Sequence, residues 1–179
     1  MKSQRQLLAR TVIMLITLVL AFIAFRVQAQ DCVDSIDSTT KVEHFRINNN
    51  GTVLDTRRNI EWMRCSVGQT WQDGKCAGTP HVMSWEKALA TAEASQLKEY
   101  NDWRLPTIHE LSSIAELRCQ QPAINLILFP ATFTGDYWTG TEFANNSDMA
   151  WLVNFSYGEN HTAKKSTSAA MRLVRSAHR

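Results

Sequence analysis

The stretch NDWRLPTIHEL, residues 101–111, contains a strong signal for the start of a helix. Thr107 stands at the N-cap position and Glu110 follows three residues later, which is the spacing of a capping box. In that motif each of the two side chains accepts a hydrogen bond from the backbone amide of the other residue. Pro106 favours extended backbone immediately before the cap. These features predict that the stretch forms a structural corner at the start of a helix, rather than a catalytic signature.

Two other residues of the stretch are also expected to stabilise the fold. We place Trp103 in or near the core, and we expect the Arg104 guanidinium to pair with a carboxylate. A further helix is predicted in residues 84–97, SWEKALATAEASQL. Ser84 can act as its N-cap, and its apolar residues form one stripe at helical spacing.

Alternating apolar and polar residues predict strands on both sides of these helices. Residues 51–65 are typical of a β-hairpin, with two apolar runs separated by a charged turn. Four short strands are expected later in the chain, at residues 136–143, 149–158, 161–167 and 169–175. The last two are expected to pair with each other. The sequence therefore predicts an α+β fold with two helices, antiparallel β hairpins and a meander.

The first 29 residues have the pattern of an export signal. Basic residues precede residues 11–25, which carry no charge, and small residues follow up to Ala29. We predict a signal peptide, residues 1–29, cut after Ala29. An uncleaved membrane anchor is the alternative, although the apolar run is shorter than the roughly 20 residues of a spanning helix. A lead-in segment, residues 30–50, and one domain, residues 51–176, would then form an exported protein of the periplasm, the cell surface or the medium.

All the cysteines follow the predicted signal peptide, and an even number in an oxidising compartment favours disulfides. They are Cys32, Cys65, Cys76 and Cys119. Three pairings are possible, and we favour Cys65 with Cys76 and Cys32 with Cys119. The first pair would close a loop with an Asp-Gly turn, and the second would fix the N-terminal segment to the end of a helix. A zinc site is not indicated, because the spacing contains no Cys-x-x-Cys pair.

The charge does not support a generally basic nucleic-acid-binding protein. Four of the 19 basic residues and none of the 17 acidic residues lie in residues 1–29, so the remaining chain has a formal charge of −2. Residues 150–179 nevertheless hold five basic residues and one acid, a local excess of +4. This excess is either scattered surface charge or a local anion-binding face.

Several segments together resemble the Lcl C-terminal domain family, named after the Legionella collagen-like protein. The resemblance covers roughly residues 51–175 and rests on the ordered segments GTVLDTRRNIEWMRCSVGQTW, SWEKALATAEA, YNDWRLPTIHELSSI, NLILFP, YWTGTEF, AWLVNFSYG and MRLVR. The turn at residues 57–60 departs from the Thr-Gly-Leu-like turn common in the family. The resemblance implies an exported bacterial protein, and the namesake is an adhesin whose domain is associated with sulfated glycans. RLPT and RLVR are also similar to relatives of the formylglycine-generating enzymes, which implies a C-type-lectin-like fold.

The sequence contains no recognisable catalytic set. The cysteines are not placed like the redox pair of a formylglycine-generating oxidase, a Gly-x-Ser-x-Gly motif is absent, and the histidines are dispersed without a His-Glu-x-x-His pair. Residues 142–148 could offer carboxylate and amide oxygens to calcium, but we interpret them as an ordinary polar turn. We expect no enzymatic activity, no cofactor and no metal.

The candidate ligand-binding residues are basic or aromatic, because cations bind sulfate or carboxylate groups and an aromatic ring can stack on a sugar. They are Lys164, Lys165, Arg172, Arg175 and Trp71. We expect a module that recognises glycans or extracellular matrix, with anionic or sulfated glycans as partners. The alternative is a structural or protein-binding subunit of a pilus or envelope assembly without glycan binding. Nucleic acid is not an expected partner, and a membrane is one only through an uncleaved N-terminal segment.

Overall fold

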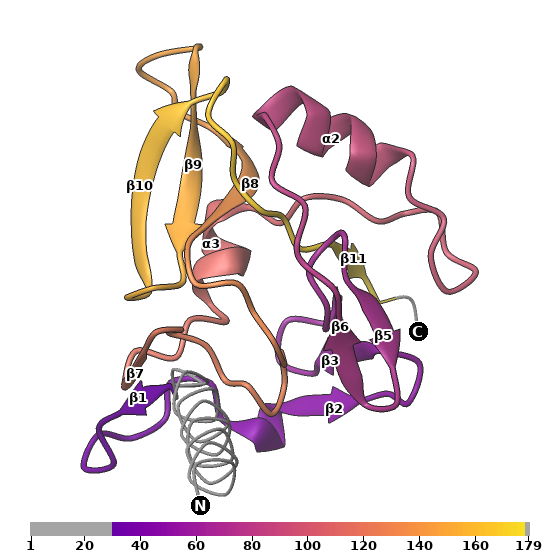
Figure 1. Ribbon diagram of the computed structural model, residues 1–179, viewed down its shortest axis with the longest axis vertical. Coiled ribbons are helices and arrows are strands. Elements are labelled where there is room, and N and C mark those ends of the chain that lie inside the picture. The colour runs from indigo at the N-terminus through magenta and orange to yellow at the C-terminus, as the bar shows by residue number, and fades with distance from the viewer. Residues whose placement is uncertain (1–29, 178–179) are drawn as a thin grey trace, which may run out of the picture.

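The computed structural model describes residues 30–177 (Figure 1), so the predicted signal peptide and its cleavage site lie outside the described residues. The described chain is mostly β-strand with two α-helices, α2 (Trp85–Glu93) and α3 (Ile108–Ser112), and a short 3-10 helix, Val42–His44. The strands are β1 (Asp31–Cys32), β2 (Phe45–Ile47), β3 (Thr52–Asp55), β4 (Ile60–Met63), β5 (Thr70–Gln72), β6 (Lys75–Ala77), β7 (Cys119–Gln120), β8 (Asp136–Glu142), β9 (Met149–Asn154), β10 (Glu159–Lys164) and β11 (Val174–Ser176). The predicted mixture of helices and antiparallel strands is confirmed.

A four-stranded antiparallel sheet has the strand order β11-β4-β3-β2, and the predicted hairpin forms its β3–β4 pair. Successive side chains of a strand point to opposite faces, so the register decides which residues share a face. Val53, Trp62 and Val174 lie opposite one another on adjacent strands and are buried in the core. The neighbouring residues Leu54 and Glu61 therefore point to the outer face of the sheet.

The second sheet has the order β10-β9-β8, and its strands β8 and β9 contribute buried side chains to an apolar cluster on each face. Trp138 and Leu152 are opposite each other on β8 and β9 and belong to the apolar cluster that includes α2. Tyr137 and Val153, each one residue away, belong to the cluster that includes α3. Alternation along the two strands thus places apolar side chains in both clusters.

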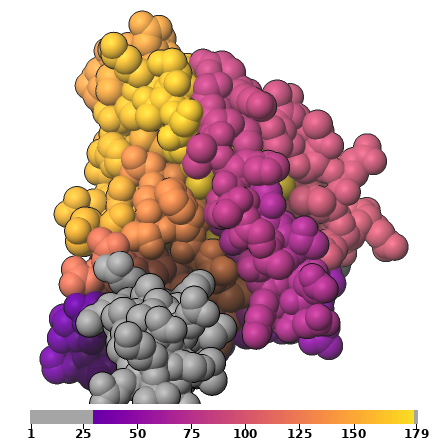
Figure 2. All heavy atoms as spheres, viewed as in Figure 1, coloured from indigo at the N-terminus to yellow at the C-terminus, as the bar shows by residue number. Residues whose placement is uncertain are grey.

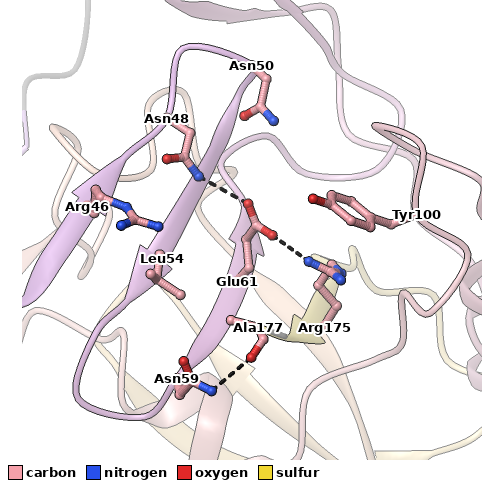
Figure 3. A pocket seen from close by; sticks show the side chains of 9 residues that line it. All are labelled: Arg46, Asn48, Asn50, Leu54, Asn59, Glu61, Tyr100, Arg175 and Ala177. Atoms are coloured by element: carbon pink, nitrogen blue, oxygen red, sulfur yellow. Dashed lines mark hydrogen bonds and ion pairs between the residues drawn. The ribbon is translucent and has the colours of Figure 1, made fainter. Parts of the chain in front are cut away.

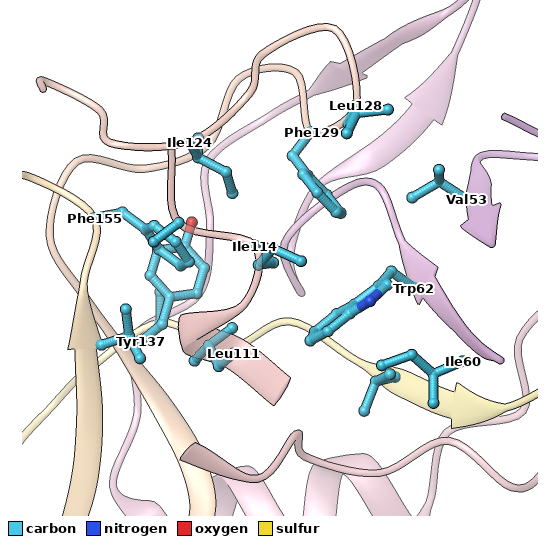
Figure 4. Packing of buried hydrophobic residues seen from close by; sticks show 14 residues of the cluster. Val53, Ile60, Trp62, Leu111, Ile114, Ile124, Leu128, Phe129, Tyr137 and Phe155 are labelled. Carbon is cyan, nitrogen blue, oxygen red and sulfur yellow. The ribbon is translucent and has the colours of Figure 1, made fainter. Parts of the chain in front are cut away.

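Helix α3 lies between the two sheets (Figure 4). Leu111 of this helix and Ile114, just beyond its end, are fully buried in the cluster that contains Trp62 of one sheet and Tyr137 of the other. Phe129 completes this contact with an edge-to-face arrangement against Trp62, their ring centres 6.3 Å apart. Such pairs contribute beyond the area that they bury.

The capping box predicted at the start of α3 is confirmed. The Thr107 hydroxyl accepts a hydrogen bond from the Glu110 amide at 3.2 Å, and the Glu110 carboxylate accepts one from the Thr107 amide at 2.7 Å. The Arg104 guanidinium donates to both oxygens of that carboxylate, at 2.7 and 2.8 Å. Trp103 is buried and donates its indole N–H to the Leu97 carbonyl. The corner thus has its hydrogen-bonding partners within the fold.

Replacing Thr107 by Ala is expected to lower the free energy of unfolding by about 1 kcal/mol, because the Glu110 amide loses its acceptor. Thr107→Ser keeps the hydroxyl and should retain most of the stability. Urea unfolding of the three proteins measures both effects. Equal midpoints for the Ala variant and the parent protein would show that the cap contributes nothing.

The prediction that the last two strands pair with each other is wrong. β10 pairs with β9, whereas β11 pairs with β4 in the other sheet. Between them, residues 169–173 run extended and connect the two sheets. Met171 and Leu173 of this segment are completely buried in the α2 cluster. A surface hairpin with β10 would expose these apolar side chains, so burial decides the pairing.

Both favoured disulfides are present in the structure. Cys65–Cys76 joins the β5–β6 hairpin to the end of β4, and Cys32–Cys119 links β1 to β7. Two disulfides indicate an oxidising environment such as exported proteins meet. Among residues 30–177, no helix has the length and apolar character needed to cross a membrane.

The lead-in segment is an integral part of this fold. β2 forms one edge of the four-stranded sheet. Further upstream, Ser38, Thr39 and Thr40 surround the carboxylate of Glu116, which is only 2% exposed. Residues 30–50 are therefore held by a strand pairing, a disulfide and a buried carboxylate.

Candidate functional site

A polar pocket of about 450 Å³ lies on the outer face of the four-stranded sheet (Figure 3). One row of side chains crosses all four strands, because Arg46 of β2 is opposite Leu54 of β3, Leu54 is opposite Glu61 of β4, and Glu61 is opposite Arg175 of β11. Cross-strand neighbours on one face lie about 5 Å apart, which lets these four side chains form one wall.

Loops complete the lining of this pocket. Asn48 and Asn50 come from the turn between β2 and β3 on one side of the row, and Asn59 and Ala177 lie on its other side, at the opposite ends of the strands. Asn59 has a φ of 53°, a backbone conformation that asparagine tolerates better than most residues. Tyr100 reaches the pocket from the loop between the two helices and is 40% exposed.

Glu61 lies at the centre of the pocket and is held by several donors. Its Oε1 atom accepts hydrogen bonds from the Thr52 hydroxyl at 2.6 Å and from the Asn48 amide at 3.1 Å. Its Oε2 atom accepts one from Arg175 at 2.7 Å. Since both oxygens have donors and the residue is only 8% exposed, the carboxylate has a fixed orientation.

Arg175 forms the inner wall of the pocket and is held by two carboxylates. Besides its bond to Glu61, its Nε atom donates to Asp102 at 2.8 Å. Its guanidinium lies 3.6 Å from the centre of the Tyr100 ring, within the range of a cation–π contact. Burial lowers the pKa of Arg175, but the hydrogen bonds and charges of Asp102 and Glu61 outweigh it and raise that pKa above its ordinary value.

Arg46 is the exposed cation of the pocket. Within residues 30–177, its guanidinium has neither an ion pair nor a side-chain hydrogen bond, in contrast to Arg175. An anionic group that entered the pocket would therefore meet Arg46 as its available charged donor. The asparagine amides can donate and accept hydrogen bonds, and Tyr100 offers an aromatic edge. Together these groups can bind a ligand that carries hydroxyl groups and a negative charge.

The prediction that Arg172 contacts a ligand is wrong, because this side chain is completely buried. Its guanidinium donates to the carbonyl oxygens of Met63 and Arg64 and, at 2.8 Å, to the Thr132 hydroxyl. Burial lowers its pKa. Arg172 thus satisfies backbone groups of the interior, where a solvent-borne ligand does not reach it.

The predicted basic patch is not formed either. Lys164 and Lys165 lie on a different part of the surface, in a shallow hollow of about 360 Å³. Its lining is Glu86, Asp148, Lys164, Lys165 and Ser166. Lys165 forms an ion pair with Glu142 at 2.7 Å and lies 4.2 Å from the centre of the Trp85 ring. The acids of this hollow offset the lysines, and neither Arg172 nor Arg175 joins them.

Glu142, the last residue of β8, belongs to the segment that was considered for calcium, and its carboxylate is paired with Lys165. In the part of the chain that the structure describes, no three side chains of histidine, cysteine, aspartate or glutamate are arranged to hold a metal ion.

Trp71 has contacts within the fold. Its indole N–H donates to the Asn49 carbonyl at 3.2 Å, and the Arg64 guanidinium lies 4.4 Å from the ring centre. The ring also packs closely on Gly51. Trp71 therefore fits the interpretation of a plug under the disulfide loop better than that of a free platform for a sugar.

Arg46, Asn48, Asn50 and Tyr100 were not among the residues singled out in the sequence. A period-two pattern in the β3–β4 hairpin could have assigned Glu61 to the outer face. The pairing of β11 with β4 and the position of the Tyr100 loop depend on tertiary contacts that the pattern does not encode.

The fold and the site define a small, disulfide-bonded α+β domain with a polar pocket on the outer face of one sheet. A model of the Lcl C-terminal domain family matches residues 51–175, and the chain belongs to this family. A search of curated proteins found no match. The matched range begins at Gly51, so β2 and Arg46, which form one side of the pocket, lie just outside it.

Proposed function

We propose that this chain is an exported recognition domain that binds a glycan, such as an anionic glycan of an extracellular matrix, in the pocket around Glu61. The observation that carries the proposal is the row of side chains across the sheet, with the fixed Glu61 carboxylate in its middle. Arg46, which is unpaired within residues 30–177, lies at one end of the row, and Arg175 lies at the other end beside the Tyr100 ring (Figure 3). Sugar hydroxyl groups can both donate to Glu61 and accept from the asparagine amides.

The charge of the pocket favours a ligand with an acidic group. Arg175 is matched by Glu61 and Asp102, so Arg46 supplies the charge available to a sulfate or carboxylate. The exported chain is acidic overall, with a formal charge of −2, so long-range attraction of an anion is weak. We expect modest affinity that falls as salt screens the contact with Arg46.

Binding without catalysis is the activity that we infer for this pocket. The Glu61 carboxylate is occupied by three donors and lies next to a paired guanidinium. These donors leave one acceptor position of the carboxylate to a ligand, and among residues 30–177 the lining of the pocket offers no second carboxylate or histidine as a partner acid or base. Glu61 is therefore better suited to orient a ligand than to transfer a proton.

We further propose that the fold is a variant of the C-type-lectin-like architecture. The two helices, the antiparallel hairpins and the two disulfides support this assignment. Long irregular connections also contribute residues to the pocket, as the loop that carries Tyr100 does. Superposition of an experimental structure on a lectin-like domain would test it through the order and direction of the paired strands.

A protein-binding subunit of a pilus or envelope assembly is the second candidate function. A hollow of about 310 Å³ beside Cys119 is lined by Val33, Leu117 and Tyr157, which are 51%, 62% and 57% exposed. Exposed apolar side chains that lie together are typical of protein contacts. Chemical cross-linking in cells that captured defined envelope proteins through this hollow, with no glycan binding in vitro, would favour this candidate.

Titration with a heparin oligosaccharide tests the glycan proposal through two matched variants. Arg46→Gln removes the exposed cation of the pocket, whereas Lys164→Gln removes an exposed cation elsewhere. We expect Arg46→Gln to weaken binding about tenfold, as the loss of one charge-assisted hydrogen bond does, and Lys164→Gln to change it little. Equal effects of both variants would indicate nonspecific electrostatic attraction and would contradict the proposal.

A further inference from the structure

The wall of the pocket that carries Asn48 and Asn50 is a turn with no regular secondary structure. It is braced from inside by Thr52, whose amide donates to the Asn50 side-chain oxygen at 3.1 Å and whose hydroxyl accepts from the Asn48 amide at 2.9 Å. These bonds orient the two asparagines toward Glu61, but they do not fix the turn as a whole. A short polar turn of this kind stays ordered only where other parts of the fold hold it.

The β5–β6 hairpin supplies such a contact from the side away from the pocket. Trp71 of β5 donates its indole N–H to the carbonyl of Asn49, the residue between the two asparagines. Trp71 itself is not part of the pocket lining. Figure 2 shows this hairpin, in magenta, at the surface of the molecule. Trp71 therefore contacts the turn but does not line the pocket.

Gly51 shows how closely the indole and the turn are packed. A Cβ atom at this position would lie 2.5 Å from Cγ of Trp71, closer than real side-chain contacts allow. The φ of Gly51 is +88°, a conformation that favours glycine. The Gly51 carbonyl accepts a hydrogen bond from the Arg64 amide at 3.0 Å, and the Arg64 guanidinium lies over the indole ring. The turn is thus held between Trp71 and the end of β4.

The position of Trp71 depends in turn on the Cys65–Cys76 disulfide. Cys76 is the cross-strand neighbour of Trp71 in the hairpin, and Cys65 directly follows Arg64. Both strands of the hairpin have three residues, too few for an isolated hairpin to be stable in water. The disulfide therefore ties a weak hairpin to the strand whose residues line the pocket.

We propose that Trp71 is a positioning residue for the pocket, which sets its affinity by holding the turn of Asn48 and Asn50 without contacting the ligand. This inference rests on the proposed function of the pocket and adds a second determinant of affinity, located behind it. Removal of the Cys65–Cys76 crosslink by substitution should release the hairpin and weaken binding by the same route.

A double-mutant cycle with a heparin oligosaccharide tests the coupling between Trp71 and Asn48. Trp71→Ala and Asn48→Ala are each expected to weaken binding about tenfold, and the double variant is expected to be little worse than either single variant. Trp71→Phe keeps most of the packing and should recover part of the affinity. The Cys65→Ser/Cys76→Ser variant should resemble Trp71→Ala. Independent, multiplying effects of Trp71→Ala and Asn48→Ala would overturn the proposal, as would a Trp71→Ala variant that binds like the parent protein while Asn48→Ala binds weakly.

Hydrogen exchange of the free protein separates this inference from the proposed function. Trp71→Ala is expected to increase the exchange rate of the Arg64 amide, which donates to Gly51, and Thr107→Ala at the distant corner is the control. Faster exchange in Trp71→Ala, with no heparin binding by the parent protein or any variant, would refute the glycan proposal. It would still support the contact by which Trp71 holds the turn of Asn48 and Asn50. Unchanged exchange of the Arg64 amide in Trp71→Ala would refute the positioning role of Trp71, whichever ligand the pocket binds.

Discussion

Replacing Glu116 by Gln is expected to lower the free energy of unfolding by about 3 kcal/mol at neutral pH. The carboxylate is almost completely buried, and the Ser38 hydroxyl and the Thr40 amide and hydroxyl donate to its Oε2 atom. The Thr39 amide and hydroxyl donate to Oε1. A neutral amide can accept on one side only, so the variant would leave buried donors without acceptors. Glu43→Gln, at an exposed position, is the control and should change little.

The same carboxylate makes the stability depend on pH. Burial by itself raises the pKa of Glu116, but the hydrogen bonds from Ser38, Thr40 and Thr39 outweigh it and lower the pKa from 4.5 to about 2. A group whose pKa is lower in the folded state stabilises it above the unfolded pKa, and this stabilisation is lost as the pH falls toward the folded pKa. The difference between the parent protein and Glu116→Gln should therefore be complete above pH 5 and shrink progressively toward pH 2. Urea unfolding across this range measures it, and a difference independent of pH would contradict the assignment.

Replacing Arg175 by Met is expected to have the second large effect, a loss of about 3 kcal/mol together with loss of heparin binding. The guanidinium is nearly buried, and its removal leaves the buried Glu61 carboxylate without a cation. Arg58→Met removes a half-exposed guanidinium from Asp55 and should cost less than about 1 kcal/mol.

Restoring neutrality distinguishes the charge of Arg175 from its packing. In Arg175→Met/Glu61→Gln the uncompensated carboxylate is gone, so part of the stability should return. Heparin binding should not return, because the pocket then lacks its central acceptor. A double variant less stable than Arg175→Met would show that the ion pair is not the reason for the loss.

Local signals made the helices, the hairpin and the corner predictable. The Thr107 capping box and the β3–β4 alternation depend on residues that are close in sequence, and both occur in the structure. The Cys65–Cys76 disulfide is also local, because it closes a short loop that contains turn residues. Such interactions are independent of how the rest of the chain packs, so a single sequence was enough to identify them.

The pocket depends instead on long-range pairing. Arg172 or Arg175 was expected to form an anion patch with Lys164 or Lys165, since the strands that carry them follow each other in the chain. Instead, β11 pairs with β4 and places Arg175 next to Glu61. Arg172, taken as a surface cation, is buried because residues 169–173 cross the interior. Arg46 lies in a segment that looked like a polar lead-in. Charge and alternation indicated which residues are polar but not which of them meet.

The most direct test of the binding pocket is an NMR titration of the isotopically labelled protein with a heparin oligosaccharide at low and physiological salt. Binding in the pocket should shift the amide resonances of Arg46, Asn48, Glu61 and Tyr100 most strongly, and the shifts should be smaller at the higher salt concentration. Shifts that cluster at Lys164 and neighbouring residues, with the pocket resonances unchanged, would contradict the assignment of the site.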